Sequence, residues 1–388
     1  MPRQPYAQRL FSKAVSAEMK SVNLLIKPAS SLCNMRCRYC FYQDVAGNRE
    51  IESYGIMSAE TAHLLIDRAF EYADNIFFAF QGGEPTLCGH EFYTDFTEYA
   101  AEKQSGKKAD VRYGIQTNGL LIDEEFAEIF AKNNFLVGIS LDGTKECHDL
   151  NRIDAAHEGT FSRVKKAADL LAKKKVDFNV LSVVTEAGAR HAEGNYNFFK
   201  KNGLEFIQYI PQIAPFDQKG DSDTLSAKSY GMFLCRTFDL WYRDFCSGKY
   251  ISIRDFDNYC GILMGRRPEI CSLQGRCSCN LTVEANGNVY PCDFYVLDEY
   301  LIGNIRDLTL DEMINSDTSK KFISESFAEQ KECSNCRWRP LCRTGCRRNK
   351  EPISDTGGYQ FFCDAYKMFF EHCFERMKTV PSILNTKY

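Results

Sequence analysis

The stretch Ser31–Tyr42 reads SLCNMRCRYCFY and spaces Cys33, Cys37 and Cys40 as C-x3-C-x2-C. The run just before it, VNLLIK, has the length and apolar character of a short strand, so the thiols lie on the loop that leaves a predicted strand. A structural zinc site closes with four ligands, whereas thiolates also hold iron–sulfur clusters. Three thiolates on a four-iron cluster leave one iron open, which indicates a reactive centre. Half of a zinc site, or three buried free thiols, are the alternatives.

The composition is that of an ordinary globular protein, with 388 residues of which 44% are hydrophobic and 26% charged. A net charge of −4 gives no general electrostatic reason to expect nucleic acid binding. Cysteines are many, at 18, but the chain is long and its basic first residues lack the apolar segment of a secretion signal. The sequence contains no run of about 18 apolar residues, so it predicts no membrane span. We therefore expect a reduced, cytoplasmic protein whose cysteines bind metal.

Six strand-like segments alternate with helical segments in the first part of the chain. The predicted strands are short, rich in β-branched and aromatic residues, and end at Gly, Pro, Asn or Asp: Asn23–Lys27, Ile76–Phe80, Val111–Gln116, Leu136–Leu141, Phe178–Thr185 and Phe206–Ile210. The predicted helices are a segment capped by Ser58 that runs to about Tyr72, then Glu91–Lys103, Asp123–Asn133, Thr160–Lys174 and Gly194–Asn202. Repeated β/α units predict a parallel sheet with right-handed crossovers. Because the composition changes near residue 250, we expect an α/β fold with an open, partial (β/α)6 TIM-like barrel.

Unusual residues follow the predicted strands one after another, at the carboxyl ends where barrel enzymes place their chemistry. These motifs are the three cysteines, Gln81–Pro85 (QGGEP), Thr117–Gly119, Ser140 with Asp142-Gly143, and Pro211–Ile213. Gly82 and Gly83 let a ligand approach the backbone closely, and the Glu84 carboxylate can pair with an ammonium group. A strand-to-helix turn is the alternative for QGGEP alone. Five such motifs on one rim indicate a binding site.

A second group of cysteines lies near the C-terminus, at 271, 277, 279, 292, 333, 336, 342, 346 and 363. Asn286-Gly287, between alternating apolar residues, predicts a β-hairpin that brings Cys279 and Cys292 close together. Eight thiols suffice for two four-cysteine sites. The local spacing leaves zinc and iron–sulfur clusters both open. A zinc-ribbon scaffold or binding module without catalysis is therefore an alternative that iron and sulfide content would distinguish.

The predicted organisation is an extension over 1–20, the barrel over 21–250, a linker over 251–270, a cysteine-rich domain over 271–375 and a tail over 376–388. The C-x3-C-x2-C motif, with Tyr39 between the last two cysteines, resembles the radical S-adenosylmethionine (SAM) superfamily. The second group, C-x5-C-x14-C followed by C-x2-C-x5-C-x3-C and a last cysteine sixteen residues on, resembles the SPASM extension of that superfamily. The chain is most similar to the anaerobic sulfatase-maturing enzymes, in LLIKPASSLCNMRCRYCFY, FQGGEPT and CDFYVLD.

This resemblance implies three [4Fe–4S] clusters, SAM, and oxidation of a Cys or Ser residue of a sulfatase to 3-oxoalanine (Cα-formylglycine) under anaerobic conditions. SAM would be cleaved to a 5′-deoxyadenosyl radical that takes a hydrogen from Cβ of the target, and an electron would leave through the auxiliary clusters. The alternative is a related radical SAM peptide maturase that forms a thioether or crosslink on a ribosomal peptide. Such enzymes often carry an N-terminal peptide-recognition domain, for which the residues before the first predicted strand are too few.

The resemblance also implies a role for each motif. Cys33, Cys37 and Cys40 would hold the first cluster. The residues expected around SAM are Tyr39, Gly83, Glu84, Ser140, Arg152 and Ile213. The first auxiliary cluster would be held by Cys271, Cys277, Cys292 and Cys346, and the second by Cys333, Cys336, Cys342 and Cys363.

Asp293 follows the expected ligand Cys292 and, by the resemblance, would be the general base that removes the thiol or hydroxyl proton. Taken alone, Asp293 is typical of a solvated or capping residue. Arg152 alone is equally a surface charge, and Ile213 alone is equally a core residue. The expected partners are a sulfatase polypeptide and an external electron donor, without nucleic acid or membrane, and the chain is expected to be a monomer.

Overall fold

The computed structural model describes residues 20–216, 224–327, 331–351 and 360–381, and one sheet runs through them. The strand order is β10-β9-β8-β1-β2-β3-β4-β5-β6-β7. The strands are β1 (Ser21–Lys27), β2 (Asn75–Phe80), β3 (Asp110–Thr117), β4 (Leu136–Ser140), β5 (Asp177–Val184), β6 (Phe206–Pro211), β7 (Ser252–Ile253), β8 (Thr282–Glu284), β9 (Asn288–Tyr290) and β10 (Gly303–Asn304). Neighbouring strands from β1 to β7 are parallel, which confirms the predicted partial barrel.

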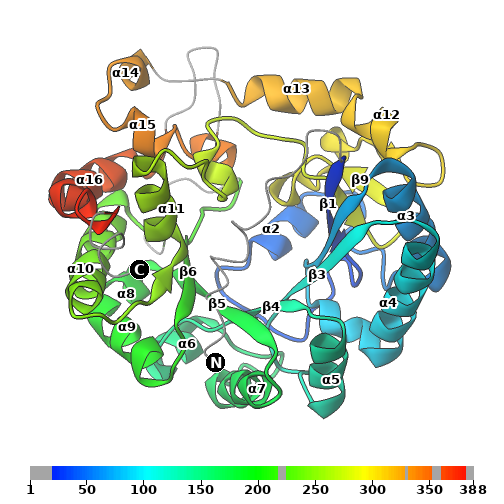
Figure 1. Cartoon of the computed structure of the whole chain (residues 1–388), viewed down its shortest axis with the longest axis horizontal. Helices are drawn as coiled ribbons and strands as arrows, with labels where there is room; N and C mark the ends of the chain where they lie inside the picture. Colours follow the sequence, from blue (N-terminus) through cyan, green and yellow to red (C-terminus); the bar gives the residue numbers. More distant parts are fainter. Residues whose placement is uncertain (1–19, 217–223, 328–330, 352–359, 382–388) are drawn as a thin grey trace.

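Most barrel helices lie around the outer side of the curved sheet, whereas α2 (Phe41–Gly47) is drawn toward its middle (Figure 1). In the barrel they are α2 (Phe41–Gly47), α3 (Ala59–Tyr72), α4 (Gly89–Gly106), α5 (Glu124–Lys132), α6 (Lys145–Asn151), α7 (Phe161–Lys173), α8 (Glu186–Ala189), α9 (Ala192–Lys201), α10 (Ala227–Cys246) and α11 (Arg254–Leu263). The later helices are α12 (Leu310–Ile314), α13 (Asp317–Glu325), α14 (Lys331–Ser334), α15 (Arg339–Cys342) and α16 (Cys363–Met377). No helix of the described residues is long and apolar enough to cross a membrane.

Local sequence signals account for the barrel elements. The Ser58 hydroxyl accepts a hydrogen bond from the Thr61 N–H and begins α3, and the Asp123 carboxylate accepts one from the Phe126 N–H and begins α5. In β2 every second side chain is buried, as expected for a strand between a helical layer and the barrel interior. The observed helix caps and the period-2 burial of β2 therefore agree with the sequence patterns.

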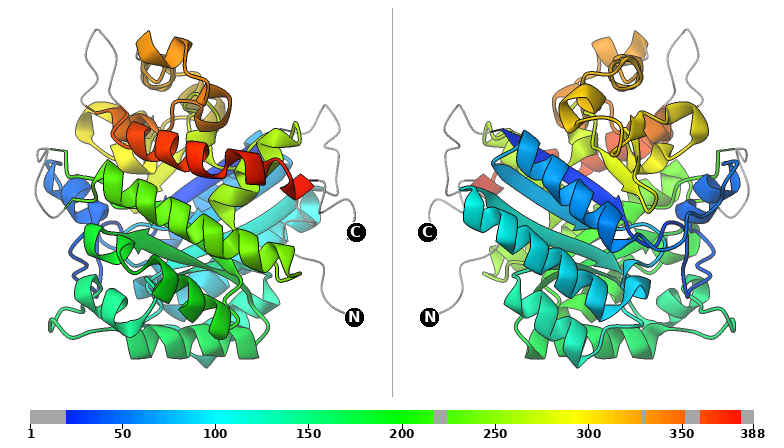
Figure 2. Two further views of the ribbon diagram at one scale, coloured as in Figure 1. Left: turned by 90° about the vertical axis from the view of Figure 1, so that its left-hand side faces the viewer. Right: turned by 90° about the vertical axis from the view of Figure 1, so that its right-hand side faces the viewer.

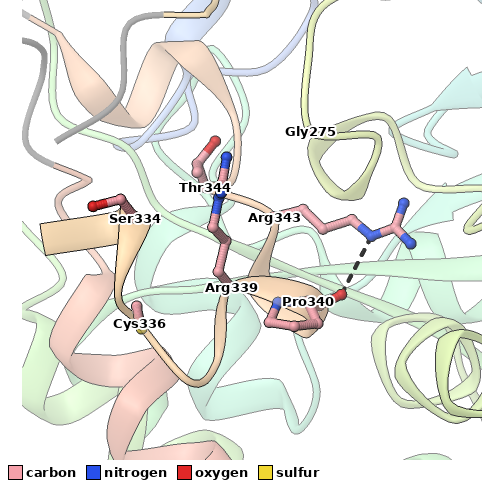
Figure 3. A pocket seen from close by; sticks show the side chains of 7 residues that line it. All are labelled: Gly275, Ser334, Cys336, Arg339, Pro340, Arg343 and Thr344. Carbon is pink, nitrogen blue, oxygen red and sulfur yellow. Dashed lines mark hydrogen bonds between the residues drawn. The ribbon is translucent and has the colours of Figure 1, made fainter. Parts of the chain in front are cut away.

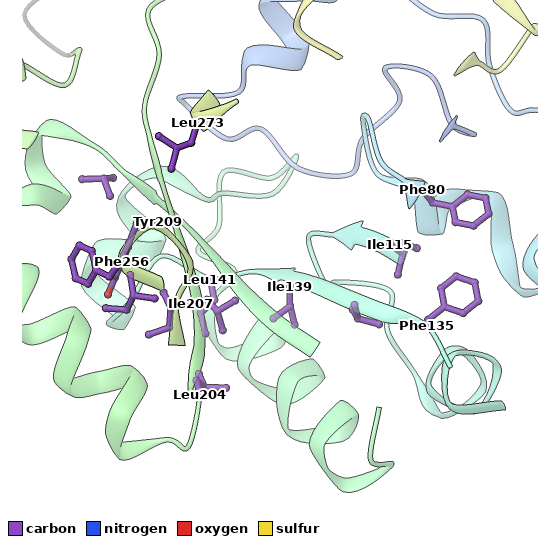
Figure 4. Close-up of a cluster of buried hydrophobic side chains, with 14 of the residues drawn as sticks. Phe80, Ile115, Phe135, Ile139, Leu141, Leu204, Ile207, Tyr209, Phe256 and Leu273 are labelled. Atoms are coloured by element: carbon purple, nitrogen blue, oxygen red, sulfur yellow. The ribbon is translucent and has the colours of Figure 1, made fainter. Parts of the chain in front are cut away.

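The hydrophobic core lies between the sheet and the surrounding helices (Figure 4). Phe80, Ile115 and Ile139 come from three successive strands and are almost completely buried. On the other side of the barrel, Ile207 from β6 and Phe256 from α11 belong to the same core. This packing holds the strand ends, and therefore the loops that leave them, in fixed positions.

The predicted hairpin is present, with β8 antiparallel to β9 and Gly287 at a φ of 88° in the turn. Its first strand, β8, pairs in parallel with β1, so the hairpin extends the open edge of the barrel. The cysteine-rich segments therefore lie at one end of the molecule, directly beside the first strand (Figure 2).

The range 251–270, which we expected to be a linker, contains regular secondary structure. It contains β7, which pairs with β6, and α11, which packs on the barrel. A strand of two residues has too few side chains to show a period, so the sequence does not indicate β7. The predicted extension over 1–20 lies outside the described residues except for Lys20, and so does 382–388 of the predicted tail.

Candidate active site

The cysteine loop and the QGGEP loop contact each other closely. A Cβ atom on Gly83 would lie 2.2 Å from the carbonyl oxygen of Leu32, and Gly83 has a φ of 45°. The backbone N–H of Glu84 donates to the same carbonyl at 2.7 Å. Only glycine satisfies both the left-handed backbone and this approach. Gly83 therefore fixes the cysteine loop against the end of β2.

The Glu84 carboxylate connects the neighbouring rim loops. Its Oε1 accepts hydrogen bonds from the Thr86 N–H at 3.0 Å, the Thr86 hydroxyl at 2.6 Å and the Thr117 hydroxyl at 2.7 Å. Its Oε2 accepts one from the Asn118 N–H at 2.7 Å. Oε2 therefore accepts one hydrogen bond among the described residues, against three at Oε1, and is the oxygen that can take a further donor. This capacity fits the ammonium group that the resemblance places at Glu84.

Tyr39, Asp142 and Arg152 form one buried group. The Tyr39 hydroxyl donates to Asp142 Oδ2, and the Arg152 guanidinium donates to the Tyr39 oxygen at 2.8 Å. Asp142 Oδ1 accepts from the Val183 N–H at 2.9 Å, which fixes the group to β5. Arg152 Nε is buried without a hydrogen-bond partner among the described residues. A buried donor of this kind needs an acceptor, and the carboxylate of SAM is one.

Ser140 and Ile213 lie on the same rim. The Ser140 hydroxyl, at the end of β4, accepts from the Gln116 side chain at 2.9 Å. Ile213 is half-buried, just beyond the end of β6. The residues expected around SAM therefore lie at the carboxyl ends of barrel strands or, like Tyr39 and Arg152, in the segments that follow those ends. Their contacts with SAM stay predictions.

Asp293 faces the barrel from the cysteine-rich part. Its Oδ2 accepts a hydrogen bond from the Tyr42 hydroxyl at 2.7 Å and one from the Gln81 amide at 3.2 Å. The Gln81 amide also donates to the Tyr42 oxygen at 2.6 Å. The second oxygen, Oδ1, is buried without a hydrogen-bond partner among the described residues. Burial raises the pKa of Asp293 to about 6, against the lowering effects of the Lys27 charge and of the Tyr42 hydrogen bond.

A buried ion network lies behind Asp293. Lys27 and Glu284 are partners in the β1–β8 register, and their side chains form an ion pair of 2.8 Å. Arg49 pairs with the same Glu284 oxygen at 2.6 Å, so one carboxylate serves two cations. Lys27 Nζ also lies 5.4 Å from the centre of the Tyr42 ring. The pKa of Glu284 is lowered because these two cations outweigh the effect of its burial.

Eleven cysteines expected to bind clusters fall into three groups. Cys33, Cys37 and Cys40 share one loop. Burial raises the pKa of Cys33 to about 12, and the Glu84 carboxylate and then the two neighbouring thiols add to this effect. Burial raises the pKa of Cys277, Cys292, Cys342, Cys346 and Cys363, and nearby thiols raise it further within two sets. One set is Cys271, Cys277, Cys292 and Cys346, and the other is Cys333, Cys336, Cys342 and Cys363.

Among the described residues, no group of three or more His, Cys, Asp or Glu side chains is arranged to hold a single metal ion. Cys279, which is outside the expected ligand sets, contacts the Ser319 hydroxyl, with 3.4 Å between Sγ and Oγ.

The sequence analysis did not assign roles to Tyr42, Gln81, Lys27 or Glu284. Gln81 was part of a rim motif, and its position directly after a strand was the available signal. Lys27 ends an apolar strand, which is unusual for a charge and could have marked it. Tyr42 meets Asp293 across 251 positions of sequence, and no local pattern reports such a contact.

Family models match both parts of the chain. The Radical SAM superfamily model matches residues 28–186, and the SPASM model, an iron-sulfur cluster-binding domain, matches residues 271–337. These matches cover most of the barrel and the start of the cysteine-rich part. The protein is therefore a radical SAM enzyme with a SPASM domain, and its cofactors are [4Fe–4S] clusters and SAM.

Relatives narrow the class further. The chain is 47% identical over 370 residues to a cysteine-type anaerobic sulfatase-maturating enzyme of Clostridium novyi, covering 94% of this chain and 99% of the relative. It is 30% identical to a serine-type anaerobic sulfatase-maturating enzyme of Bacteroides thetaiotaomicron, covering 91% of this chain and 89% of the relative. A solved structure of native anSMEcpe with bound AdoMet and Cp18Cys peptide is 42% identical, with a TM-score of 0.88 over 95% of this chain and all of that one.

The chain belongs to the anaerobic sulfatase-maturating enzymes. The predicted activity, oxidation of a Cys or Ser residue of a sulfatase to formylglycine, is thereby supported over the alternative of a thioether-forming or crosslinking peptide maturase. The more distant peptide-bound SuiB structure, at 16% identity and a TM-score of 0.61, shares the fold only.

Proposed function

We propose that this enzyme is of the cysteine type and converts a Cys residue of a sulfatase polypeptide to formylglycine. Identity to the cysteine-type relatives is 43–47%, against 27–30% to the serine-type relatives. This difference in identity carries the choice of Cys, and the observation that carries the oxidation chemistry is Asp293, whose Oδ1 is buried and unpartnered among the described residues. A buried carboxylate with one open oxygen can accept a proton from a substrate side chain.

The cofactor residues are assigned as the motifs indicate. Cys33, Cys37 and Cys40 hold the first cluster, and the residues that orient SAM are Tyr39, Gly83, Glu84, Ser140, Arg152 and Ile213. When bound, the cluster and SAM supply a carbon-centred radical that abstracts a hydrogen atom from Cβ of the target residue. The contribution of the protein is to hold SAM and the peptide in one geometry and to exclude competing reactions.

Asp293 performs the proton transfer in this proposal. Its Oδ2 is held by Tyr42 and Gln81, which fixes the direction of Oδ1. The target thiol donates its proton to Oδ1 as the C–S double bond forms, and water then converts the thioaldehyde to the aldehyde with release of hydrogen sulfide. Lys27 lies behind this group and supplies the positive charge that favours an ionised carboxylate.

The SPASM cysteines and the partners complete the proposal. Cys271, Cys277, Cys292 and Cys346 hold the first auxiliary cluster, and Cys333, Cys336, Cys342 and Cys363 hold the second. The domains are a barrel over 21–250 and a SPASM domain over 271–375, connected through 251–270, whose β7 and α11 pack on the barrel. The enzyme works as a cytoplasmic monomer with a sulfatase polypeptide and an external electron donor, and it binds no nucleic acid.

The test uses two peptides derived from a sulfatase that differ only in Cys or Ser at the target position. Anaerobically reconstituted enzyme is incubated with SAM, a chemical reductant and each peptide, and the aldehyde is measured by mass spectrometry. We expect the Cys peptide to be converted at least about tenfold faster, the scale of about 1.4 kcal/mol between two transition states. Equal or faster conversion of the Ser peptide contradicts the cysteine-type assignment.

A further inference from the structure

Two adjoining hollows open on the surface above the SPASM cysteines. One, of about 510 Å³, is lined by Gly275, Ser334, Cys336, Arg339, Pro340, Arg343 and Thr344 (Figure 3). The other, of about 540 Å³, is lined by residues that include Cys271, Cys277, Arg267, Arg276 and Arg343. Arg343 belongs to both linings, so the hollows form one continuous surface, which we call the arginine surface.

The arginine surface has a charge opposite to that of the whole protein. Four arginines line it, at 267, 276, 339 and 343, and Glu269 is the acidic side chain among the lining residues of the two hollows. The chain as a whole has a net charge of −4. Arg267 and Arg276 are exposed, and Arg343 is half-buried with its Nε donating to the carbonyl of Pro340 at 3.3 Å. Such a concentration attracts anionic partners and raises their association rate.

The same surface lies where both auxiliary cysteine sets approach solvent. Cys271 and Cys277 of one set line the second hollow, and Cys336 of the other set lines the first. The backbone between Cys342 and Cys346 has three successive left-handed residues, with φ of 50° at Arg343, 68° at Thr344 and 70° at Gly345. This conformation is costly for the two non-glycine residues, and it keeps Arg343 at the junction of the two hollows.

The proposed reaction requires an electron exit. Conversion of –CH2–SH to –CH=S breaks one C–H and one S–H bond, forms the second C–S bond and removes two electrons with two protons. One proton and one electron leave together as the hydrogen atom taken by the SAM-derived radical, and Asp293 takes the other proton. One electron remains. It balances the electron that reductive cleavage of SAM consumes, so it can return to that step or pass to a one-electron acceptor outside the protein.

We propose that the arginine surface docks a small acidic iron–sulfur protein, which in its oxidised form accepts this electron. The inference rests on the proposed function for the direction of electron flow. Charge complementarity selects an acidic partner, and the position of the cysteines selects a redox partner over other anions.

The test measures binding of an acidic bacterial ferredoxin to the anaerobically reconstituted full chain by calorimetry at low ionic strength. The charge-reversal variant is Arg267→Glu/Arg276→Glu/Arg343→Glu. The matched control, Arg112→Glu/Arg190→Glu/Arg243→Glu, makes the same change in net charge at exposed barrel positions. We expect the first variant to weaken binding by about tenfold or more and the control by less than about twofold. If the charge-reversal variant loses iron, Arg267→Gln/Arg276→Gln/Arg343→Gln replaces it, with an expected loss of at least about threefold.

Equal weakening in the variant and the control would overturn the proposal, because net charge alone would then explain binding. A short DNA duplex that binds the arginine surface more tightly than the ferredoxin would overturn the assignment to a redox protein. SAM and peptide are absent from this assay. A failure to form formylglycine therefore refutes the proposed function without affecting the binding result, and loss of surface-specific binding leaves formylglycine formation with a chemical reductant untouched.

Discussion

The ion network of Lys27, Arg49 and Glu284 provides a prediction that depends on charge balance in a buried site. Glu284→Gln keeps the side-chain volume and removes the one carboxylate that both cations share at 2.8 and 2.6 Å. All three side chains are almost fully buried, so the two cations would be left without a counter-ion. Breaking a buried pair in this way costs about 3–5 kcal/mol. We expect a loss of this size in the free energy of unfolding.

Lys27→Met is the informative second variant. It keeps the stem that packs on Gly82, where a Cβ atom would lie 2.5 Å from Lys27 Cε, and it leaves Arg49 and Glu284 as a neutral pair. We therefore expect Lys27→Met to cost less than Glu284→Gln. In the double variant only Arg49 is unpaired, so the two effects should be non-additive, with a coupling energy of about 1–3 kcal/mol.

The assay is anaerobic urea unfolding of the reconstituted proteins, followed by tryptophan fluorescence, with iron content measured beforehand. Asp311→Asn serves as the control, because the Lys20–Asp311 pair is exposed and 3.6 Å long. A pair of that kind contributes about 0–1 kcal/mol. Additive single effects, or a Glu284→Gln cost no larger than that of the control, would refute the charge-balance reasoning.

Three further predictions test the site. The pKa of Glu284 is lowered in the folded chain. The stability difference between wild type and Glu284→Gln should therefore be full above the ordinary pKa of 4.5 and shrink as pH falls from there toward the lowered folded pKa. A stability difference that grows as pH falls would contradict this prediction. Gly83→Ala should weaken SAM binding by more than about tenfold, because it adds a clash with Leu32 to left-handed backbone strain of about 1–2 kcal/mol. The control is Gly203→Ala, at a glycine with a φ of 66° and open space around it, and it should leave equilibrium binding of SAM unchanged. Cys277→Ala should lose roughly a third of the bound iron, one cluster of three, while Cys279→Ala should keep it; equal iron in both would remove Cys277 from the ligand set.

Much of the fold could be predicted because its signals are local. The barrel strands are short apolar runs, with period-2 burial clearest in β2, and α3 and α5 begin at side chains, Ser58 and Asp123, that cap them. Helix α2 could not be predicted, because it has seven residues and no side-chain cap. It is held by packing, with Phe41 and Phe294 rings 4.7 Å apart.

The site was predicted where spacing or strand ends report it, and missed where distant segments meet. The thiol groups and QGGEP follow from local patterns. The contacts of Tyr42 with Asp293 and of Lys27 with Glu284 depend on the hairpin pairing with β1. Nothing in the hairpin sequence specifies which barrel edge it joins, so these partners emerge only from the tertiary structure.

In the proposed mechanism, Asp293 acts on the substrate thiol and not on the cofactor. Asn is nearly isosteric with Asp but cannot take up the proton, so Asp293→Asn tests that role with little change in shape. The decisive measurement is the yield of peptide aldehyde per 5′-deoxyadenosine, with a Cys peptide and one iron-replete preparation each of wild type and Asp293→Asn. We predict that the variant forms 5′-deoxyadenosine while this ratio falls by about 10²-fold or more, the usual scale for losing a general base. An unchanged ratio with intact clusters would contradict the account and remove Asp293 from the mechanism.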